Sequence, residues 1–402
     1  MRHPRFLVTT MSAAALVLSL PACGPAGRPA PAAAPAATSP EITPDDLRAR
    51  LGAYAHDSML GRRSGELGGV MAAAHLADEA RRLGLEPAGE DGTWYQNVPL
   101  VQRTLDPAAS VTAGGVTLRA WDDLVPRDQG KAAREIDGAP AVYGGRWEGA
   151  DGGGGLIPPE AAAGKLVVIA VAPAAGGTPA GTVNRAVTTA RFAAAAGIAV
   201  ATLDRIGRTD RLGLQETGAQ LASARGAETP AFMYATGRAA EAILGTPLAG
   251  LSPGTPGRMV RGQVRFVDSP APHPVRNVVA RLQGSDPALR GQMVAIGAHY
   301  DHEGIAPVAE EHDSLRAWNT VMRPGGANST PGAPTADQAA RIRRLMDSLR
   351  RARPARMDSV LNGADDDGSG TVAMLEIAER MARGGERPRR SVLFVWHAAE
   401  EL

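Results

Sequence analysis

Residues 293–302, MVAIGAHYDH, place an apolar run directly before a histidine, an aspartate and a second histidine. The run Met293–Ala298 is typical of a buried strand, and a comparable run, Asn277–Leu282, precedes it across a turn-rich linker. We expect these two strands to be adjacent. A later apolar run, Ser391–Trp396, ends directly before His397–Leu402 (HAAEEL). Because ligands bind at the carboxyl ends of strands in open α/β sheets, the polar residues after these strands are candidates for a functional site.

A third polar segment, Gly363–Gly370 (GADDDGSG), lies directly before a helix expected over Thr371–Ala382. Its three consecutive carboxylates, Asp365–Asp367, repel one another unless a cation or a helix N-terminus compensates for their charge. Glu400 and Glu401, after the last strand, repel each other in the same way. A histidine near clustered carboxylates, without cysteine, indicates a hard or borderline divalent metal, zinc first. Each motif alone is more often a turn, a cap or a solvated surface. Their order and their placement at strand ends favour a metal site.

Taken together, HYDH, NGADDDGSGT and a strand ending in AAEE resemble the co-catalytic zinc exopeptidase family of bacterial and vacuolar aminopeptidases. Glutamate carboxypeptidase, glutaminyl cyclase and the transferrin receptor are related to that family. Met59–Gly69 (MLGRRSGELGG) and Gly84–Leu100 resemble its N-terminal part, and residues 138–267 resemble its inserted protease-associated domain. The resemblance implies a mixed-sheet α/β catalytic domain that carries an inserted protease-associated α/β domain.

The resemblance also implies roles for individual residues. His299 would ligate one Zn²⁺, Asp366 would bridge two, and Glu401 would ligate the other. Asp301 would orient the imidazole of His299, and Glu400 would be the general base. In the family, the bond after the bridging aspartate is commonly a non-proline cis peptide, here Asp366 to Asp367.

The family continues beyond the AAEE motif with two further metal ligands. We therefore expect the catalytic domain to be incomplete at its C-terminal end and each zinc to lack one protein ligand. A catalytic zinc takes about three protein ligands and a water, so we expect this chain of 402 residues to be catalytically inactive.

The N-terminus has the pattern of an export signal. Arg2 and Arg5 precede the apolar stretch Phe6–Leu20, which is too short for a membrane span and typical of a secretory signal peptide. Cys23, the single cysteine, follows a segment that resembles the lipobox of bacterial lipoproteins, which implies a lipid anchor at Cys23 outside the cytoplasm. A soluble secreted protein cut near Ala22 is the alternative.

Composition and charge exclude further classes of protein. With 402 residues, 44% of them hydrophobic and 21% charged, the chain is long enough for several folded domains. A formal charge of +1 gives no general attraction to nucleic acid, so none is expected as a partner. One cysteine excludes a disulfide scaffold and an all-cysteine zinc site.

The predicted organisation has five parts. It comprises a signal peptide (1–22), a Pro/Ala-rich tether (23–40), an N-terminal part of the peptidase domain (41–137), a protease-associated domain (138–267) and the catalytic metal-binding part (268–402). Helices are expected from Pro44, over 69–83, and within the insertion 303–362 from a capping box formed by Thr335 and Gln338.

These features predict a membrane-anchored zinc aminopeptidase with two Zn²⁺ ions, which hydrolyses N-terminal residues of peptides. Two alternatives stay open: a glutaminyl cyclase with one zinc, and a non-catalytic binding protein of the transferrin-receptor type. The protease-associated insertion argues against the cyclase. Intact His299, Asp366, Glu400 and Glu401 argue against the binding protein.

Overall fold

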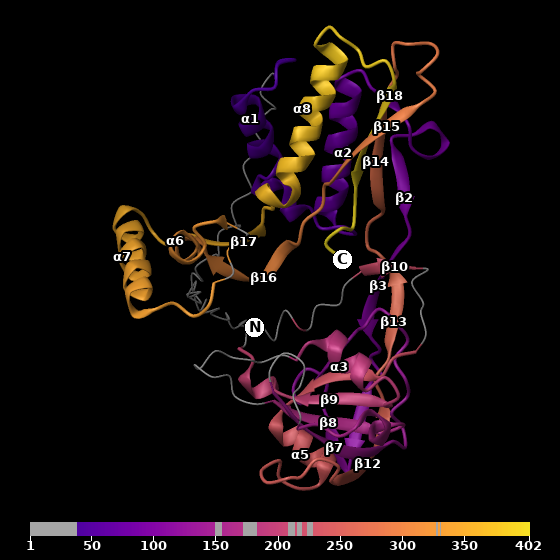
Figure 1. Cartoon of the computed structure of the whole chain (residues 1–402), viewed down its shortest axis with the longest axis vertical. Helices are drawn as coiled ribbons and strands as arrows, with labels where there is room; N and C mark the ends of the chain where they lie inside the picture. The colour runs from indigo at the N-terminus through magenta and orange to yellow at the C-terminus, as the bar shows by residue number, and fades with distance from the viewer. Residues whose placement is uncertain are drawn as a thin grey trace, which may run out of the picture.

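The structure, a computed structural model, describes residues 38–148, 155–171, 183–207, 214, 219–222, 228–326, 329 and 331–402. The predicted signal peptide, Cys23 and most of the predicted tether lie outside the described residues. The described chain has the mixed α/β fold that the sequence predicts. It forms two bodies, each built on a sheet, and a side arm (Figure 1).

The first body is built on a sheet of five strands among the described residues, and we call it the five-stranded body. Its order is β1-β14-β18-β15, and β2 also pairs with β14. The strands are β1 (Glu86–Pro87), β2 (Tyr95–Val98), β14 (Val275–Leu282), β15 (Met293–His299) and β18 (Ser391–His397). The expectation that β14 and β15 are adjacent is wrong, because β18 lies between them, antiparallel to β14 and parallel to β15. Strand β15 lies at the end of the sheet order, and the expectation that it is buried is also wrong, because Met293 and Val294 are 55% and 50% exposed. Its apolar run predicted a strand, but not its burial or which strand pairs with it.

Two helices, α2 (Leu67–Arg82) and α8 (Ser369–Arg383), pack on this sheet, and α1 (Pro44–Tyr54) packs against α8. The predicted start of α1 is confirmed, since the Thr43 side chain accepts a hydrogen bond from the Asp46 N–H. Side chains alternate between the two faces of a strand, so Val392, Phe394 and Trp396 of β18 point into one core with residues of α2 and α8. Figure 1 shows the three helices beside the sheet. They hold the strand ends that carry the predicted site.

The second body, the eight-stranded body, has a sheet of eight strands in the described chain, with the order β5-β4-β12-β7-β8-β9-β11-β6. The strands are β4 (Ser110–Ala113), β5 (Val116–Leu118), β6 (Leu124–Arg127), β7 (Pro140–Trp147), β8 (Leu166–Val171), β9 (Gly197–Ala201), β11 (Ala231–Ala235) and β12 (Pro256–Gln263). The sheet therefore begins at Ser110, before residue 138, where the sequence changes in texture. Strands β4 to β6 are short and carry no long apolar run, so the sequence did not reveal them.

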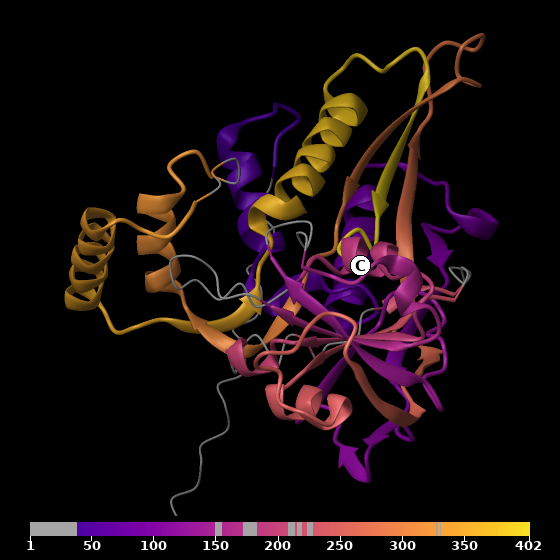
Figure 2. The same ribbon diagram turned by 60° about the horizontal axis from the view of Figure 1, so that its bottom comes forward.

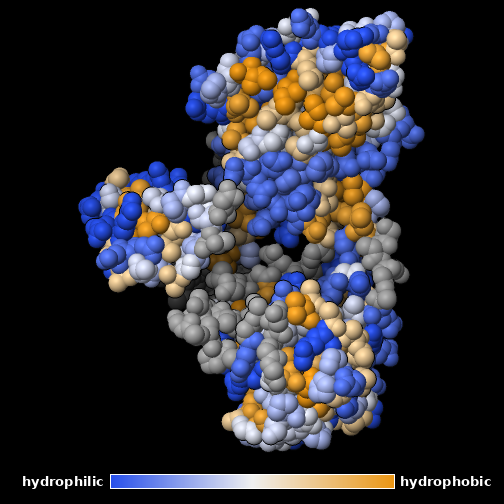
Figure 3. Space-filling model, viewed as in Figure 1, coloured by the Kyte–Doolittle hydropathy of each residue, from blue (hydrophilic) through white to orange (hydrophobic). Residues whose placement is uncertain are grey.

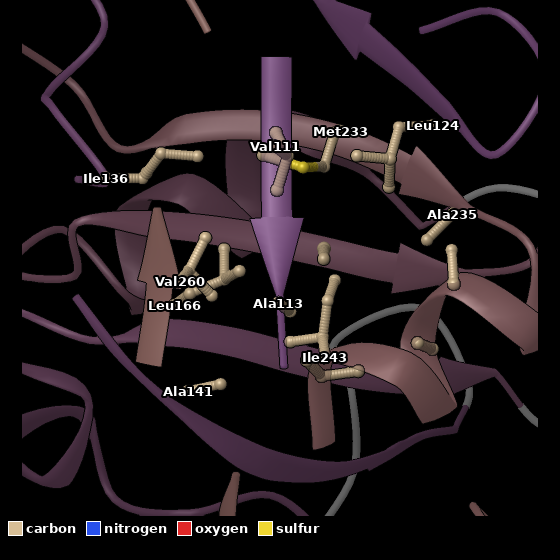
Figure 4. Packing of buried hydrophobic residues seen from close by; sticks show 14 of the residues in the cluster. Val111, Ala113, Leu124, Ile136, Ala141, Leu166, Met233, Ala235, Ile243 and Val260 are labelled. Atoms are coloured by element: carbon tan, nitrogen blue, oxygen red, sulfur yellow. The ribbon is translucent and has the colours of Figure 1, made fainter. Parts of the chain in front are cut away.

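The central strands of this sheet are buried on both faces. Apolar side chains of α5 (Gly237–Leu244) pack with one face and form a core around Val111, Leu166 and Val260 (Figure 4). On the other face, Phe192, directly after α3 (Arg185–Arg191), packs with the remaining side chains of β8 and β9. Strands β7, β8, β9 and β11 run parallel, and parallel strands covered on both faces read as continuous apolar runs.

Two antiparallel strands carry the chain between the bodies. Strand β3 (Leu100–Leu105) leads from β2 into the eight-stranded body, and β13 (Phe266–Pro270) leads back to β14, with β10 (Ala219–Leu221) beside β3. Figure 1 shows this connection between the two sheets, and Figure 2 shows the molecule turned so that the eight-stranded body comes forward. None of the helices in the described ranges combines the length and the hydropathy needed to cross a lipid bilayer.

The side arm is the insertion after His302. It consists of β16 (Gly304–Glu311), α6 (His312–Met322), α7 (Ala336–Ala352) and β17 (Met357–Leu361), with β16 and β17 paired. The predicted capping box of Thr335 and Gln338 is present at the start of α7. Helix α6 was not predicted, and it packs against α7, whose residues are all at least partly exposed.

Candidate metal centre

Strands β15 and β18 run parallel and end together, which brings the residues after them to one edge of the sheet. His299, at the end of β15, is paired in register with His397, at the end of β18. The Tyr300 N–H donates a hydrogen bond to the His397 carbonyl at 3.0 Å. Figure 1 shows the end of β18 beside the C-terminus, close to the lower end of α8. The predicted clustering at strand ends is therefore present.

The acidic segment before α8 forms an irregular π-type turn, η6 (Ala364–Gly368). The peptide bond between Asp366 and Asp367 is cis, as the resemblance implies. Asp367 Oδ1 accepts a hydrogen bond from the Gly370 N–H at 2.9 Å, so this carboxylate binds the first turn of α8. The helix N-terminus thus accounts for one of the three aspartates, and Asp366 is left to face the end of β15.

Three of the predicted residues meet around one imidazole nitrogen. His299 Nε2 lies 3.1 Å from Asp366 Oδ1 and 3.9 Å from Glu400 Oε2. The His299 side chain is 11% exposed, whereas those of Asp366 and Glu400 are 70% and 55% exposed. The protein holds the imidazole in place, while both carboxylates are exposed to solvent.

Asp301 is completely buried beside this group. Its carboxylate accepts hydrogen bonds from the Ser64 hydroxyl at 3.0 Å and from the Glu400 N–H at 3.4 Å. His299 Nδ1 lies 3.7 Å from Asp301 Oδ1, which is longer than a hydrogen bond. Among the described residues this buried nitrogen has no hydrogen-bond partner. The orienting role of Asp301 stays a prediction.

Two buried tyrosines fix the backbone between His299 and Asp301. The Tyr54 hydroxyl donates to the Tyr300 carbonyl at 2.9 Å, and the Tyr300 hydroxyl donates to the Arg276 carbonyl at 2.9 Å. Burial raises the pKa of Tyr300, and the negative charge of Asp301 raises this pKa further. Both effects keep the Tyr300 hydroxyl protonated, so it remains a donor.

Glu401 lies apart from the His299 group and pairs with His302. Glu401 Oε1 is 2.7 Å from His302 Nδ1, and both side chains are mostly buried. With Asp301 they line a cavity of about 380 Å³, and β16 of the side arm also contributes to its lining. Figure 3 shows a broad hydrophilic area on the side of the five-stranded body that faces the eight-stranded body. Sequence reasoning gave His302 no role, although its position at the end of the HYDH motif was a usable signal.

The donor types at this edge suit zinc. An imidazole nitrogen and carboxylate oxygens are ordinary zinc ligands, and His299 Nε2 already faces two carboxylate oxygens. In the described part of the chain, however, no group of three or more His, Cys, Asp or Glu side chains is arranged so that it could hold a metal ion. The predicted ligand set of His299, Asp366 and Glu401 therefore stays a prediction.

Comparison with known proteins gives one family and several solved structures. The model of peptidase family M28 matches residues 277–402. The chain is similar to a zinc aminopeptidase from Bacillus subtilis, at 14% identity and a TM-score of 0.40, over 90% of this chain and 63% of that one. It is also similar to an aminopeptidase from Aneurinibacillus sp. strain AM-1 (14% identity, TM-score 0.38, 89% and 62% of the two chains). A third is a peptidase M28 precursor from Shewanella amazonensis (16%, 0.34, 88% and 66%).

No curated protein matches the chain. The chain spans less than two thirds of the length of the solved structures named above. The family match contains all three polar motifs, with His299, Asp366 and Glu401 among its residues. Residues 277–402 therefore match peptidase family M28, which supports the resemblance of the motifs to the co-catalytic zinc exopeptidase family.

Proposed function

We propose that this chain contributes the catalytic centre of a zinc-dependent aminopeptidase, which removes N-terminal residues from peptides outside the cytoplasm. One observation carries the proposal. His299, Asp366 and Glu400 converge within 4 Å at the carboxyl edge of a sheet, inside the segment that matches peptidase family M28. A structural cap or turn would need no such convergence of an imidazole with two separate carboxylates.

Zinc would be held by His299, Asp366 and Glu401, with Asp366 shared between two ions. When bound, zinc polarises a peptide carbonyl and lowers the pKa of water. Glu400 is the general base of the proposal. Its carboxylate accepts a proton from the attacking water and passes it to the leaving amine. The exposure of its side chain, 55%, leaves room for a substrate beside it.

Asp301 acts through His299 in this proposal. Its carboxylate is buried and is held by Ser64 and by the Glu400 N–H, so it cannot turn toward the substrate. A fixed carboxylate beside Nδ1 selects the tautomer that leaves Nε2 free for a metal. The hydrogen bond from the Glu400 N–H also ties the position of Asp301 to the backbone of the general base.

The proposed location rests on the N-terminal sequence. Lipidation of Cys23 would attach several acyl chains to one residue, and two or more lipid signals give stable anchoring where one gives only reversible binding. The Pro/Ala-rich tether would then separate the folded bodies from the membrane. A Cys23→Ala variant should leave the membrane fraction. If it stays with the membrane, the anchor lies elsewhere.

A binding measurement tests the aminopeptidase proposal without requiring turnover. Leucine hydroxamate chelates zinc and carries the free amine of an N-terminal residue, and its N-acetyl derivative is the matched control. We expect calorimetry with the full chain and zinc to give leucine hydroxamate at least a tenfold lower Kd than the acetylated compound. Asp366→Ala should abolish this difference. Equal affinities for the two compounds would exclude recognition of an N-terminal amine, and binding that is independent of Asp366 would exclude the proposed metal site.

A further inference from the structure

Arg62 connects two loops that carry predicted metal ligands. Its side chain is completely buried. The guanidinium donates to the Tyr300 carbonyl from Nε at 3.0 Å, to the Asn362 carbonyl from Nη1 at 2.6 Å and to the Gly363 carbonyl from Nη2 at 2.8 Å. Nη1 also donates to the Tyr54 carbonyl at 3.3 Å.

The acceptors of these bonds lie on both sides of the proposed metal centre. Tyr300 stands between His299 and Asp301, and Asn362 and Gly363 lead directly into the turn that carries Asp366. We propose that Arg62 is a positioning residue that holds the β15 strand end and the Asp366 turn at the separation that the metal centre requires. This inference rests on the proposed function, because it assumes that a metal binds between these two loops.

The backbone around Arg62 supports this inference. Leu60, Gly61 and Arg62 have φ values of 53°, 64° and 53°, so three consecutive residues lie in the left-handed region. Residues other than glycine rarely adopt this conformation, because Cβ then crowds the following carbonyl oxygen. Gly61 packs closely as well, since a Cβ there would lie 2.1 Å from the Gly304 carbonyl oxygen. The chain thus keeps an unfavourable turn at the residue whose buried side chain bonds to both loops.

The chemistry of the site requires arginine in particular. Burial lowers the pKa of Arg62, and the negative charge of Asp301 opposes this effect only in part. The guanidinium also lies over the ring of Tyr54, 4.6 Å from its centroid. Its donors lie in one plane and point in several fixed directions, so they can reach carbonyls on separate segments at the same time. A lysine ammonium has three donors at one point and cannot span the same acceptors.

Amide hydrogen exchange on the metal-free full chain tests the inference. The two reporters are the Tyr300 N–H, bonded to the His397 carbonyl, and the Gly368 N–H, bonded to the Gly363 carbonyl at 3.1 Å. Arg62→Met should speed exchange at both reporters at least tenfold, and Arg62→Lys should have a smaller effect on both. Arg103→Met is the matched control, because Arg103 is also buried but pairs with Asp268 in the connection between the bodies. This control should leave both reporters unchanged.

Zinc affinity is the second readout, measured by competition with a chromophoric chelator. Arg62→Met should raise the zinc Kd at least tenfold, and Arg103→Met should change it less than twofold. If Arg62→Met does not fold, Arg62→Lys decides. Parent-like exchange in a folded Arg62 variant, or faster exchange at only one reporter, would overturn the inference. If the parent chain binds no zinc, the proposed function fails, and the exchange data still decide whether Arg62 couples the two loops.

Discussion

Asp366 and Glu400 face the same nitrogen of His299, but the proposed function gives them different tasks. Asp366 would be a ligand, and Glu400 would be a base. Glu400→Gln keeps the size of the side chain and removes its ability to accept a proton. We therefore expect this variant to bind zinc within about threefold of the parent, and in any form of the enzyme that turns over, to lower kcat by about a hundredfold or more.

Zinc titration and a p-nitroanilide assay, run on the same preparations, separate these tasks. The control is Glu303→Gln, an exposed carboxylate of the neighbouring cavity that has no assigned role. Full activity of Glu400→Gln with zinc bound would show that another group is the base. Loss of zinc from the same variant would show that Glu400 is a ligand.

Gly363 tests how tightly the two halves of the site fit together. Its φ is +52°, and an added Cβ would lie 2.4 Å from Cγ of His302 and 2.6 Å from the carbonyl oxygen of Asp366. Gly363→Ala should therefore displace one of these residues and weaken zinc binding about tenfold, the effect usual for supporting contacts. Gly115→Ala is the control, because Gly115 also has a positive φ, +79°, but no atom lies within 4 Å of its added Cβ.

The two alanine variants are compared by chelator competition and by urea unfolding. Both should lose about 1 kcal/mol of stability through the left-handed backbone, and Gly363→Ala should lose more because its Cβ also displaces a neighbouring residue. Only Gly363→Ala should lose zinc affinity. Equal zinc affinity in the two variants would mean that His302 and the Asp366 turn do not have to fit closely.

At the scale of elements, a buried ion cluster joins α1, α2 and α8. Arg50 of α1 donates to Glu79 of α2 at 2.7 Å, and also to Glu376 and Glu379 of α8. All four residues are less than 10% exposed. Removal of the arginine would leave three buried carboxylates without their shared partner. Arg50→Met should therefore lower the free energy of unfolding by about 3 kcal/mol or more.

Urea unfolding measures this loss, with Arg48→Met as the control. Arg48 lies on the same helix, but its side chain is 76% exposed, so its removal should cost less than about 0.5 kcal/mol. A similar small loss of stability in both variants would show that Arg50 does not stabilise the packing of α1 against α2 and α8.

The cluster also predicts a dependence of stability on pH. Burial raises the pKa of Glu79, but the hydrogen bonds and charges of Arg82 and Arg50 outweigh burial and hold this pKa below its usual 4.5. A carboxyl whose pKa is lower in the folded state stabilises the protein above its unfolded pKa and loses that contribution as pH falls. The stability difference between the parent and Arg50→Met should thus be full at neutral pH and shrink below pH 4.5. An unchanged difference in acid would contradict the assignment.

Local sequence signals predicted where helices begin better than they predicted which strands pair with one another. Thr43 and the capping box of Thr335 and Gln338 mark helix starts through bonds between near neighbours, and both are present. Strand order depends on distant parts of the chain, so β18 was not expected between β14 and β15. Helix α6 was missed because it lies directly after β16 and has no side-chain cap at its start.

The same division applies to the candidate site. Motif order and strand ends predicted that the polar segments would meet, because two parallel strands carry their carboxyl ends to one edge, whereas the choice of His299, Asp366 and Glu400 came from the resemblance. The pairing of Glu401 with His302 depends on how the chain turns after each strand, which no local pattern in HYDH or AAEE specifies. Likewise, Arg62 lies far from both loops in sequence, and its bonds to three segments depend on the folded body as a whole.

For the molecule as a whole, the proposed ligand set would limit activity. A catalytic zinc takes about three protein ligands and a water, whereas His299, Asp366 and Glu401 supply two to each of two ions. We therefore expect the purified chain to hydrolyse amino-acid p-nitroanilides no faster than a zinc-only control. Turnover above that control that disappears in Glu400→Gln would show that the residues present are sufficient for catalysis.

The eight-stranded body has two apolar cores of its own, one on each face of its sheet. Its unfolding should therefore not depend on zinc. Hydrogen exchange in β8 and in β15, measured at rising temperature with and without zinc, monitors the unfolding of each body separately. Zinc should protect β15 and leave β8 unchanged. Equal protection of both strands would show that the two bodies unfold as one unit.

The central claim is that the edge formed by β15, β18 and the turn before α8 binds zinc through His299 and Asp366. The most direct test is a zinc titration of the full chain by chelator competition, with His299→Ala, Asp366→Ala and His397→Ala as variants. His397 is the control, because it ends the neighbouring strand, with its ring centroid 6.3 Å from that of His299, and has no assigned ligand role. We expect the first two variants to weaken zinc binding at least tenfold and His397→Ala to leave it unchanged. Parent-like zinc affinity in His299→Ala, or an equal loss in His397→Ala, would contradict the central claim.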